Sequence, residues 1–174
     1  MELNLKKVTV RERTNKMYLE KFLTAERIQL KCKASDWRDA IRIASVPLLQ
    51  ANDIKPEYVK AMQDAVEEHG PYMCLAEGFA LSHAEPSSLV HKECISLITL
   101  DPPIEFGNKD FDPIDVLIAF GTPDAKAHMN FLRELCELLN KPDSFIKIRE
   151  AKTKNEILSL FSTHDHSKKE VLIG

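Results

Sequence analysis

The sequence predicts an α/β fold in which helices cover a mixed β-sheet. Apolar runs that suit buried strands alternate along the chain with segments whose apolar residues recur every three or four positions. The 174 residues are enough for one domain with its own hydrophobic core. No internal repeat or low-complexity linker divides them. Strands interleaved with helices pack in layers, so we expect helices against the faces of one sheet.

The first part of the chain predicts a leader, a helix and a strand. Residues 1–16 are charged and lack periodicity, so we expect a loose leader, in which 8–10 could pair as a strand in an oligomer. Thr14 can cap a helix over about 15–24. The alternation of apolar and polar residues over 28–32 predicts a strand with one buried face.

Two amphipathic helices and an extended segment are predicted next. Ser35 or Asp36 can begin the first helix, whose apolar residues recur at steps of three and four. Pro56 suits the first turn of the second helix, and Gly70 ends it. Residues 72–84 are expected to be extended.

Two hydrophobic runs predict the central strands of the sheet. Residues 93–100 are apolar on both faces for much of their length, and Asp101 with the two prolines after it is expected to end the strand. Residues 113–120 form the most hydrophobic run in the chain. Both runs therefore suit strands that are covered on either side.

The C-terminal part predicts three helices. Thr122 is expected to cap the first, with Pro123 at its first position, and the helix should reach about residue 139. A short helix is predicted from Pro142 to about 148, and a capping box at 153–156 begins the last one. The predicted buried stripe of the first helix is Leu132, Leu135, Cys136 and Leu139, with His128 on the same side.

Composition argues against several functional classes. The chain has 24 basic and 27 acidic residues, and no segment gathers Lys and Arg beside aromatics, so nucleic acid is not an expected partner. The N-terminus lacks an apolar signal segment, and no apolar run approaches the roughly 20 residues of a membrane span, so we expect a cytoplasmic protein. The four cysteines, which form no Cys-x-x-Cys pair, are interpreted as reduced packing residues: Cys32, Cys74, Cys94 and Cys136.

Two histidines are the candidates for chemistry. His83 ends a predicted strand, where alternation places it on the face of Phe79 and Leu81. That position suits a nucleophile, but it suits a polar residue that merely caps a strand equally well. His128 lies in the second turn of a predicted helix, where it could instead bond to a carbonyl. His69 lies in a last helical turn, a position that the helix dipole alone favours.

Motif order along the chain adds a family resemblance. Residues 78–84, 94–100, 106–108 and 112–118, followed by the helix that holds His128, resemble the enzyme IIA component of bacterial sugar phosphotransferase systems (PTS). Within the mannitol/fructose superfamily (type 2), the chain is most similar to the ascorbate-specific branch. The resemblance covers about residues 17–161, which we expect to be the folded domain, with 162–174 as a C-terminal tail.

The resemblance implies a function and a site. It implies a mixed sheet of roughly five strands, flanked by helices on both sides. It implies that His83 is phosphorylated transiently, and that His128 stabilises the phosphoryl group. HPr would donate that group, a cysteine of a IIB component would accept it, and the membrane IIC component would take part indirectly. The transported molecule would be ascorbate or a related sugar, with no cofactor or metal, and a homodimer is compatible with the branch.

Two positions depart from the family pattern. Ser82 stands where Pro commonly precedes the phosphorylated histidine, and its hydroxyl could bond the imidazole or phosphate. Glu85 stands where Arg commonly follows, and a carboxylate opposes a phosphoryl dianion. These changes favour an alternative, a non-catalytic regulatory or binding module with the enzyme IIA fold. The candidates for a substitute arginine, each on a nearby predicted helix, are Arg38, Arg42 and Arg133.

A third class, a metal-dependent hydrolase, has less support. Its ligands would be His83, His91 and His128, or the pair His164 and His166. No helical His-x-x-x-His or comparable ligand spacing accompanies them. The phosphocarrier is therefore the leading hypothesis.

Overall fold

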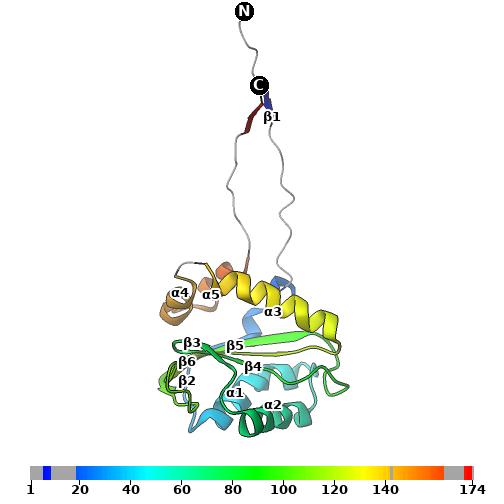
Figure 1. Ribbon diagram of the computed structural model, residues 1–174, viewed down its shortest axis with the longest axis vertical. Helices are drawn as coiled ribbons and strands as arrows, with labels where there is room; N and C mark the ends of the chain where they lie inside the picture. The colour runs from blue at the N-terminus through cyan, green and yellow to red at the C-terminus, as the bar shows by residue number, and fades with distance from the viewer. Residues whose placement is uncertain (1–5, 9–18, 142, 163–170, 174) are drawn as a thin grey trace, which may run out of the picture.

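A central β-sheet lies between two layers of helices in the computed structural model, which describes residues 6–8, 19–141, 143–162 and 171–173 (Figure 1). Helices α1 (Trp37–Gln50) and α2 (Pro56–His69) cover one face of the sheet. The other face is covered by α3 (Ala125–Leu139), α4 (Ser144–Glu150) and α5 (Lys154–Phe161). Each face has its own cluster of buried side chains. The predicted α/β class, with a five-stranded mixed sheet flanked by helices, is confirmed.

The sheet has the strand order β2-β5-β6-β4-β3. Its strands are β2 (Ile28–Cys32), β3 (Cys74–Ala76), β4 (Phe79–Ser82), β5 (Cys94–Ile104) and β6 (Ile114–Gly121). The pairs β2 with β5 and β4 with β6 are parallel, whereas β5 with β6 and β3 with β4 are antiparallel. The two long hydrophobic runs therefore occupy interior strands, as predicted, because they are buried on both faces.

One strand runs further than its sequence predicts. Asp101 was expected to end β5, but pairing resumes between Ile104 and Ile114 after a register shift beyond Thr99. Asp101 and the two prolines after it are exposed. An irregular, exposed stretch tolerates prolines because no ladder hydrogen bond is required of them there.

The helices below the sheet follow their local sequence signals. In α1 (Trp37–Gln50), the Asp36 carboxylate caps the first turn by accepting from the Asp39 N–H at 2.8 Å. Helix α2 (Pro56–His69) begins at its proline and ends at Gly70, whose φ is +76°. Both helices were predicted at these positions.

Helix α3 (Ala125–Leu139) differs from its prediction in two respects. Its cap is Asp124, whose carboxylate accepts from the Ala127 N–H at 2.9 Å, so Thr122 and Pro123 precede the helix. Of the predicted stripe, Leu135 is buried, Leu132 and Leu139 are partly buried, and Cys136 is exposed. The other buried residues of the helix are Ala127, Phe131 and Leu138. The interpretation of all four cysteines as packing residues is thus wrong for Cys136. The Phe131 ring stacks on Phe120 of β6 at 5.3 Å, which fixes the face that α3 turns to the sheet.

The last two helices are short. Helix α4 (Ser144–Glu150) starts after the predicted opening at Pro142, a residue outside the described part. Helix α5 (Lys154–Phe161) has the predicted capping box, in which Thr153 and Glu156 each bond the other's backbone N–H.

The N-terminal helix prediction is wrong over its described part. The structure has 3-10 turns at Leu19–Lys21 and Ala25–Arg27, and residues 15–18 lie outside the described part. The Leu19 N–H donates to the Glu134 carboxylate of α3 at 2.7 Å, a partner that local sequence does not reveal. Strand β1 (Lys6–Val8) pairs antiparallel with β7 (Val171–Ile173), so these two short strands, one near each end of the chain, lie side by side (Figure 1).

Candidate functional site

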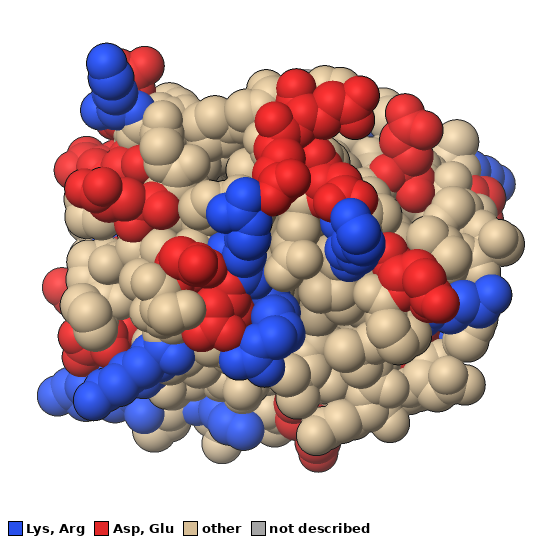
Figure 2. All heavy atoms as spheres, turned by 90° about the horizontal axis from the view of Figure 1, so that it is seen from below, with Lys and Arg blue, Asp and Glu red and all other residues tan. Residues whose placement is uncertain are grey.

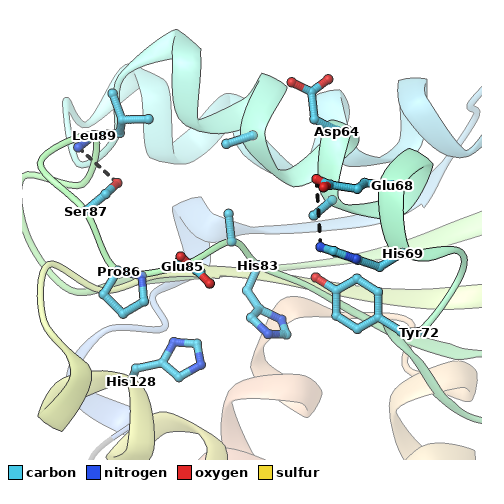
Figure 3. A pocket seen from close by; sticks show the side chains of 13 residues that line it. Asp64, Glu68, His69, Tyr72, His83, Glu85, Pro86, Ser87, Leu89 and His128 are labelled. Carbon is cyan, nitrogen blue, oxygen red and sulfur yellow. Dashed lines mark hydrogen bonds and ion pairs between the residues drawn. The ribbon is translucent and has the colours of Figure 1, made fainter.

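A cleft of about 740 Å³ opens beside the C-terminal end of β4. Helix α2, the segment after β4 and the start of α3 form its walls (Figure 3). Both candidate histidines line it. The structure thus brings His83 and His128 together from positions that are far apart in the sequence.

His83 follows the last residue of β4. Phe79 and Leu81 of that strand belong to the core cluster on the α3 side, whereas Ala80 belongs to the cluster on the α1 side, so the predicted alternation of faces is confirmed. The imidazole lies almost flat against the Phe120 ring, with 5.0 Å between centroids and 25° between planes. The Phe120 ring of β6 therefore packs against one face of the His83 imidazole.

A single hydrogen bond defines the tautomer of His83. Its Nδ1 lies 3.1 Å from the carbonyl oxygen of Leu81. A carbonyl only accepts, so Nδ1 carries the proton and donates it. In the neutral ring, Nε2 then keeps a free electron pair, which is what a nucleophile requires.

His128 lies in the second turn of α3 and faces the same space. Its ring centroid is 5.2 Å from that of His83 and 5.3 Å from that of Phe120. The Thr122 hydroxyl lies 3.5 Å from Nδ1 of His128. The His128 ring thus lies next to the His83 ring (Figure 3).

Burial shifts the protonation of both rings. Burial lowers the pKa of His83. The hydrogen bond to Leu81 partly opposes this decrease, and the neighbouring His128 adds to it. Burial also lowers the pKa of His128. Both imidazoles are therefore neutral at pH 7, where the free nitrogen of His83 is available.

The rim of the cleft is acidic. Asp64, Glu68 and Glu85 line it, and no Lys or Arg is among its described lining residues. Glu85 thus lies within the cleft and does not point away from it (Figure 3). Burial raises the pKa of the nearby Tyr72 phenol, and the negative charge of Glu85 raises it further. Any anion that enters meets carboxylates and neutral rings.

The arginines considered from sequence lie elsewhere. Arg38 pairs with Glu67, and Arg42 pairs with Asp39 at 2.6 Å, on the face of α1 and α2. Figure 2 shows this face, where basic and acidic side chains form adjoining groups of both signs. Neither these two arginines nor Arg133 lines the cleft.

Ser82 points to the other side of β4. Its buried hydroxyl donates to the Met62 sulfur of α2 at 3.3 Å. Alternation along the strand places it on the face opposite His83. The expectation that this hydroxyl could bond the imidazole is therefore wrong.

Two residues at the site, Tyr72 and Tyr58, were not singled out from sequence. The Tyr72 ring packs edge-on against His83 at 6.1 Å, and His69 packs edge-on against Tyr72 at 6.1 Å. Tyr58 belongs to α2 and is buried. Its hydroxyl lies 3.1 Å from the carbonyl oxygen of Phe120, the residue whose ring contacts both histidines. Only strand order shows that β4 and β6 are neighbours, so local patterns could not reveal these contacts.

No trio of His, Cys, Asp or Glu side chains among the described residues is arranged to hold a metal ion. His91 directs its Nδ1 to the Asn52 carbonyl at 2.8 Å, and it does not line the cleft. His164 and His166 lie outside the described residues. In the described part of the chain, every helix is too short or too polar to cross a bilayer.

Comparison with known proteins gives consistent matches. A family model, "Phosphoenolpyruvate-dependent sugar phosphotransferase system, EIIA 2", matches residues 21–164. An ascorbate-specific PTS system EIIA component of Shigella boydii is 37% identical over 134 residues, which cover 76% of this chain and 87% of that protein.

Solved structures agree with this family. The mannitol-specific cryptic phosphotransferase enzyme IIA of Escherichia coli has a TM-score of 0.76 at 31% identity, covering 83% of this chain and 98% of that one. In the complex of enzyme IIAMTL and phosphorylated enzyme IIBMTL from Escherichia coli, a chain matches with a TM-score of 0.70 at 25% identity, covering 80% and 96%.

Proposed function

The chain belongs to the EIIA 2 family of the phosphoenolpyruvate-dependent sugar phosphotransferase system, and we propose that His83 is the residue on which it carries the phosphoryl group. It is therefore a component of a phosphotransferase. One observation carries the choice of residue. The Leu81 carbonyl holds the Nδ1 proton of His83, which leaves a nucleophilic Nε2 in the ring that faces the cleft.

The proposed reaction has two transfers. In the first, the Nε2 electron pair of His83 attacks the phosphorus of a phosphohistidine on the donor, and the donor's nitrogen–phosphorus bond breaks with its electrons returning to that ring. In the second, a thiolate of the acceptor attacks the same phosphorus, and the bond to Nε2 breaks. Such a transfer needs alignment and charge stabilisation more than further covalent chemistry.

His128 is proposed to stabilise the phosphoryl oxygens. The centroid of its ring lies 5.2 Å from that of His83. An oxygen of a phosphoryl group bonded to Nε2 of His83 could therefore reach the His128 ring. Because burial lowers the pKa of His128, the neutral ring would act mainly as a hydrogen-bond donor. If the Thr122 hydroxyl donates to Nδ1, the proton of His128 is on Nε2, free to donate to phosphate.

HPr is the proposed donor, and a cysteine of a IIB component is the proposed acceptor. A membrane IIC component would be involved only through IIB. The support for IIB is that a relative of similar fold forms a complex with phosphorylated enzyme IIBMTL. Ascorbate or a related sugar is proposed because the curated relative with 37% identity is ascorbate-specific. A homodimer remains a prediction, which light scattering would check.

Incubation with phosphorylated HPr tests the assignment. We expect acid-labile phosphate on the chain, none on His83→Gln, and full labelling of His91→Gln, a control histidine outside the cleft. Labelling of His83→Gln at the wild-type level would refute the role of His83.

A non-catalytic regulatory module is the second candidate. Glu85 favours it, because its carboxylate lies in the cleft among other acidic residues and opposes a bound phosphoryl group. Absence of any label on the wild-type chain, together with retained binding to phosphorylated HPr, would support this module over the carrier.

A further inference from the structure

The Tyr58 hydroxyl joins two backbone segments directly behind the cleft. Tyr58 belongs to α2, and only 1% of it is exposed. The Ala84 N–H donates to its oxygen at 3.1 Å. The carbonyl oxygens of Ala84 and Phe120 lie 3.2 and 3.1 Å away, within reach of the single phenolic proton. One hydroxyl therefore contacts both the residue after His83 and the residue under its ring.

The Tyr58 hydroxyl lies just past the end of the pairing between β4 and β6. The parallel register of β4 and β6 ends with the pair Ser82 and Ala119. The next residues along the strands are His83 and Phe120, for which no ladder pair continues the register. The hydroxyl of Tyr58 bridges the two strands immediately beyond that point, in place of the missing ladder. Burial raises the pKa of this phenol, so the bridging proton stays in place.

The bridge bears on the geometry of His83. The ring is held by Nδ1 at the Leu81 carbonyl and by its face on Phe120. The stacking contact requires that the chain at Ala84 and the chain at Phe120 keep their spacing. The Leu81 bond lies within one strand, and it requires the ring orientation that this stacking maintains. We propose that Tyr58 is a positioning residue for phosphoryl transfer, whose hydroxyl fixes the tautomer and stacking of His83 by clamping these two segments together.

A purely structural hydroxyl would behave differently. It would contribute to the free energy of unfolding and nothing else. A positioning hydroxyl also controls how often Nε2 is aligned with the donor phosphorus, which affects the rate of transfer more than the binding of the donor. The inference rests on the proposed function for its kinetic test, whereas the tautomer of His83 can be measured without phosphate.

Tyr58→Phe is the decisive variant, because it keeps the buried ring and removes only the hydroxyl. The matched control is Ser144→Ala, which removes another buried hydroxyl bond, to the Leu138 carbonyl at 2.8 Å, away from the cleft. In the full chain, we expect Tyr58→Phe to slow single-turnover transfer from phosphorylated HPr by roughly 10-fold or more, with KM for HPr nearly unchanged. We expect ¹⁵N NMR to show a smaller share of the Nδ1–H tautomer of His83.

A second variant tests the same inference if Tyr58→Phe does not fold. A Cβ at Gly121 would lie 3.2 Å from both the Tyr58 ring and the Val90 side chain, and 3.3 Å from the Cys94 sulfur. Gly121→Ala should therefore displace the phenol together with these neighbours while keeping its hydroxyl, and shift the same tautomer in the same direction. If transfer and tautomer match those of Ser144→Ala in each variant that folds, the inference is overturned. If the wild type accepts no phosphate, the proposed function fails, and the tautomer alone then decides the role of Tyr58.

Discussion

The Nδ1–H of His83 donates to the carbonyl oxygen of Leu81, 3.1 Å away and two residues earlier in the chain. This bond leaves Nε2 as the free nucleophile, so we expect the phosphoryl group on Nε2. Coupling between ³¹P and the ring nitrogens in ¹⁵N-histidine-labelled protein would identify the atom. A group found on Nδ1 would show that the Leu81 bond breaks before transfer.

Removing the His128 ring should slow transfer without moving its site. We expect His128→Ala to reduce the rate of phosphate acceptance by about 10²-fold, the usual effect of losing one donor to a developing charge. The label should remain on His83. Quench-flow with phosphorylated HPr measures the rate, and His91→Ala serves as the control because it lies outside the cleft. An unchanged rate would leave His128 with a packing role only.

The two lowered histidine pKa values predict a pH dependence of stability. In the unfolded chain the rings take up protons near their ordinary pKa of 6.5, whereas the folded chain takes them up only at lower pH. The unfolded state then binds more protons, so stability is complete above about pH 6.5 and falls as the pH drops toward the folded pKa values. Urea unfolding at several pH values should show this slope, which His83→Gln should reduce. A stability that rises on acidification through this range would contradict the burial of the rings.

Because the rim of the cleft is acidic, neutralising Glu85 should favour the phosphorylated form of His83. Two unit charges about 4 Å apart in water interact by about 1 kcal/mol, which is a factor of roughly 5 in an equilibrium. We therefore expect Glu85→Gln to raise the ratio of phosphorylated to free His83 by up to about that factor, and Glu85→Arg to raise it further. The ratio can be measured at a fixed ratio of phosphorylated to free HPr. Glu150→Gln, an exposed change on α4, should leave it unaltered. If the ratio of phosphorylated to free His83 is the same in all these proteins, the charge of Glu85 does not act on the phosphoryl group.

Gly78, just before β4, should not tolerate a side chain. Its φ is +74°, and an added Cβ would collide with the Arg149 guanidinium and lie 2.7 Å from Oδ1 of Asp115. Those two side chains pair at 2.6 Å, so Gly78→Ala must disturb that pair in addition to straining the backbone.

Gly107→Ala is the control for the backbone term, since its φ is +91° and its Cβ would meet nothing within 4 Å. Positive φ alone costs about 1–2 kcal/mol. We expect a larger loss for Gly78→Ala in urea unfolding. Equal losses would show that the Arg149 side chain moves aside freely.

Local signals predicted the elements that depend on local contacts. The Asp36 cap, the opening proline of α2 and the Thr153 capping box each act within one helical turn, and all are found. The sequence failed where a distant partner decides. Phe131 stacks on β6 and rotates α3 away from its predicted stripe, and Glu134 reaches the first 3-10 turn.

The same distinction applies to the site. The strand end at His83 and the inward side of His128 were visible as local periodicity and a family resemblance. The support of His83 by Phe120 was not, because β4 and β6 pair although β5 lies between them in the chain. The role of the Tyr58 hydroxyl could not be predicted for the same reason, because its partners come from β6 and from the segment after β4.

The parallel pairing of β2 with β5 has a consequence for how the chain folds. Two helices and two strands lie between these partners in the chain, so the two strands can pair only after the chain has been made as far as β5. Contacts between such remote segments slow folding. Until β2 pairs with it, the apolar edge of β5 is exposed to other newly made chains, so residues 28–32 protect that edge against aggregation.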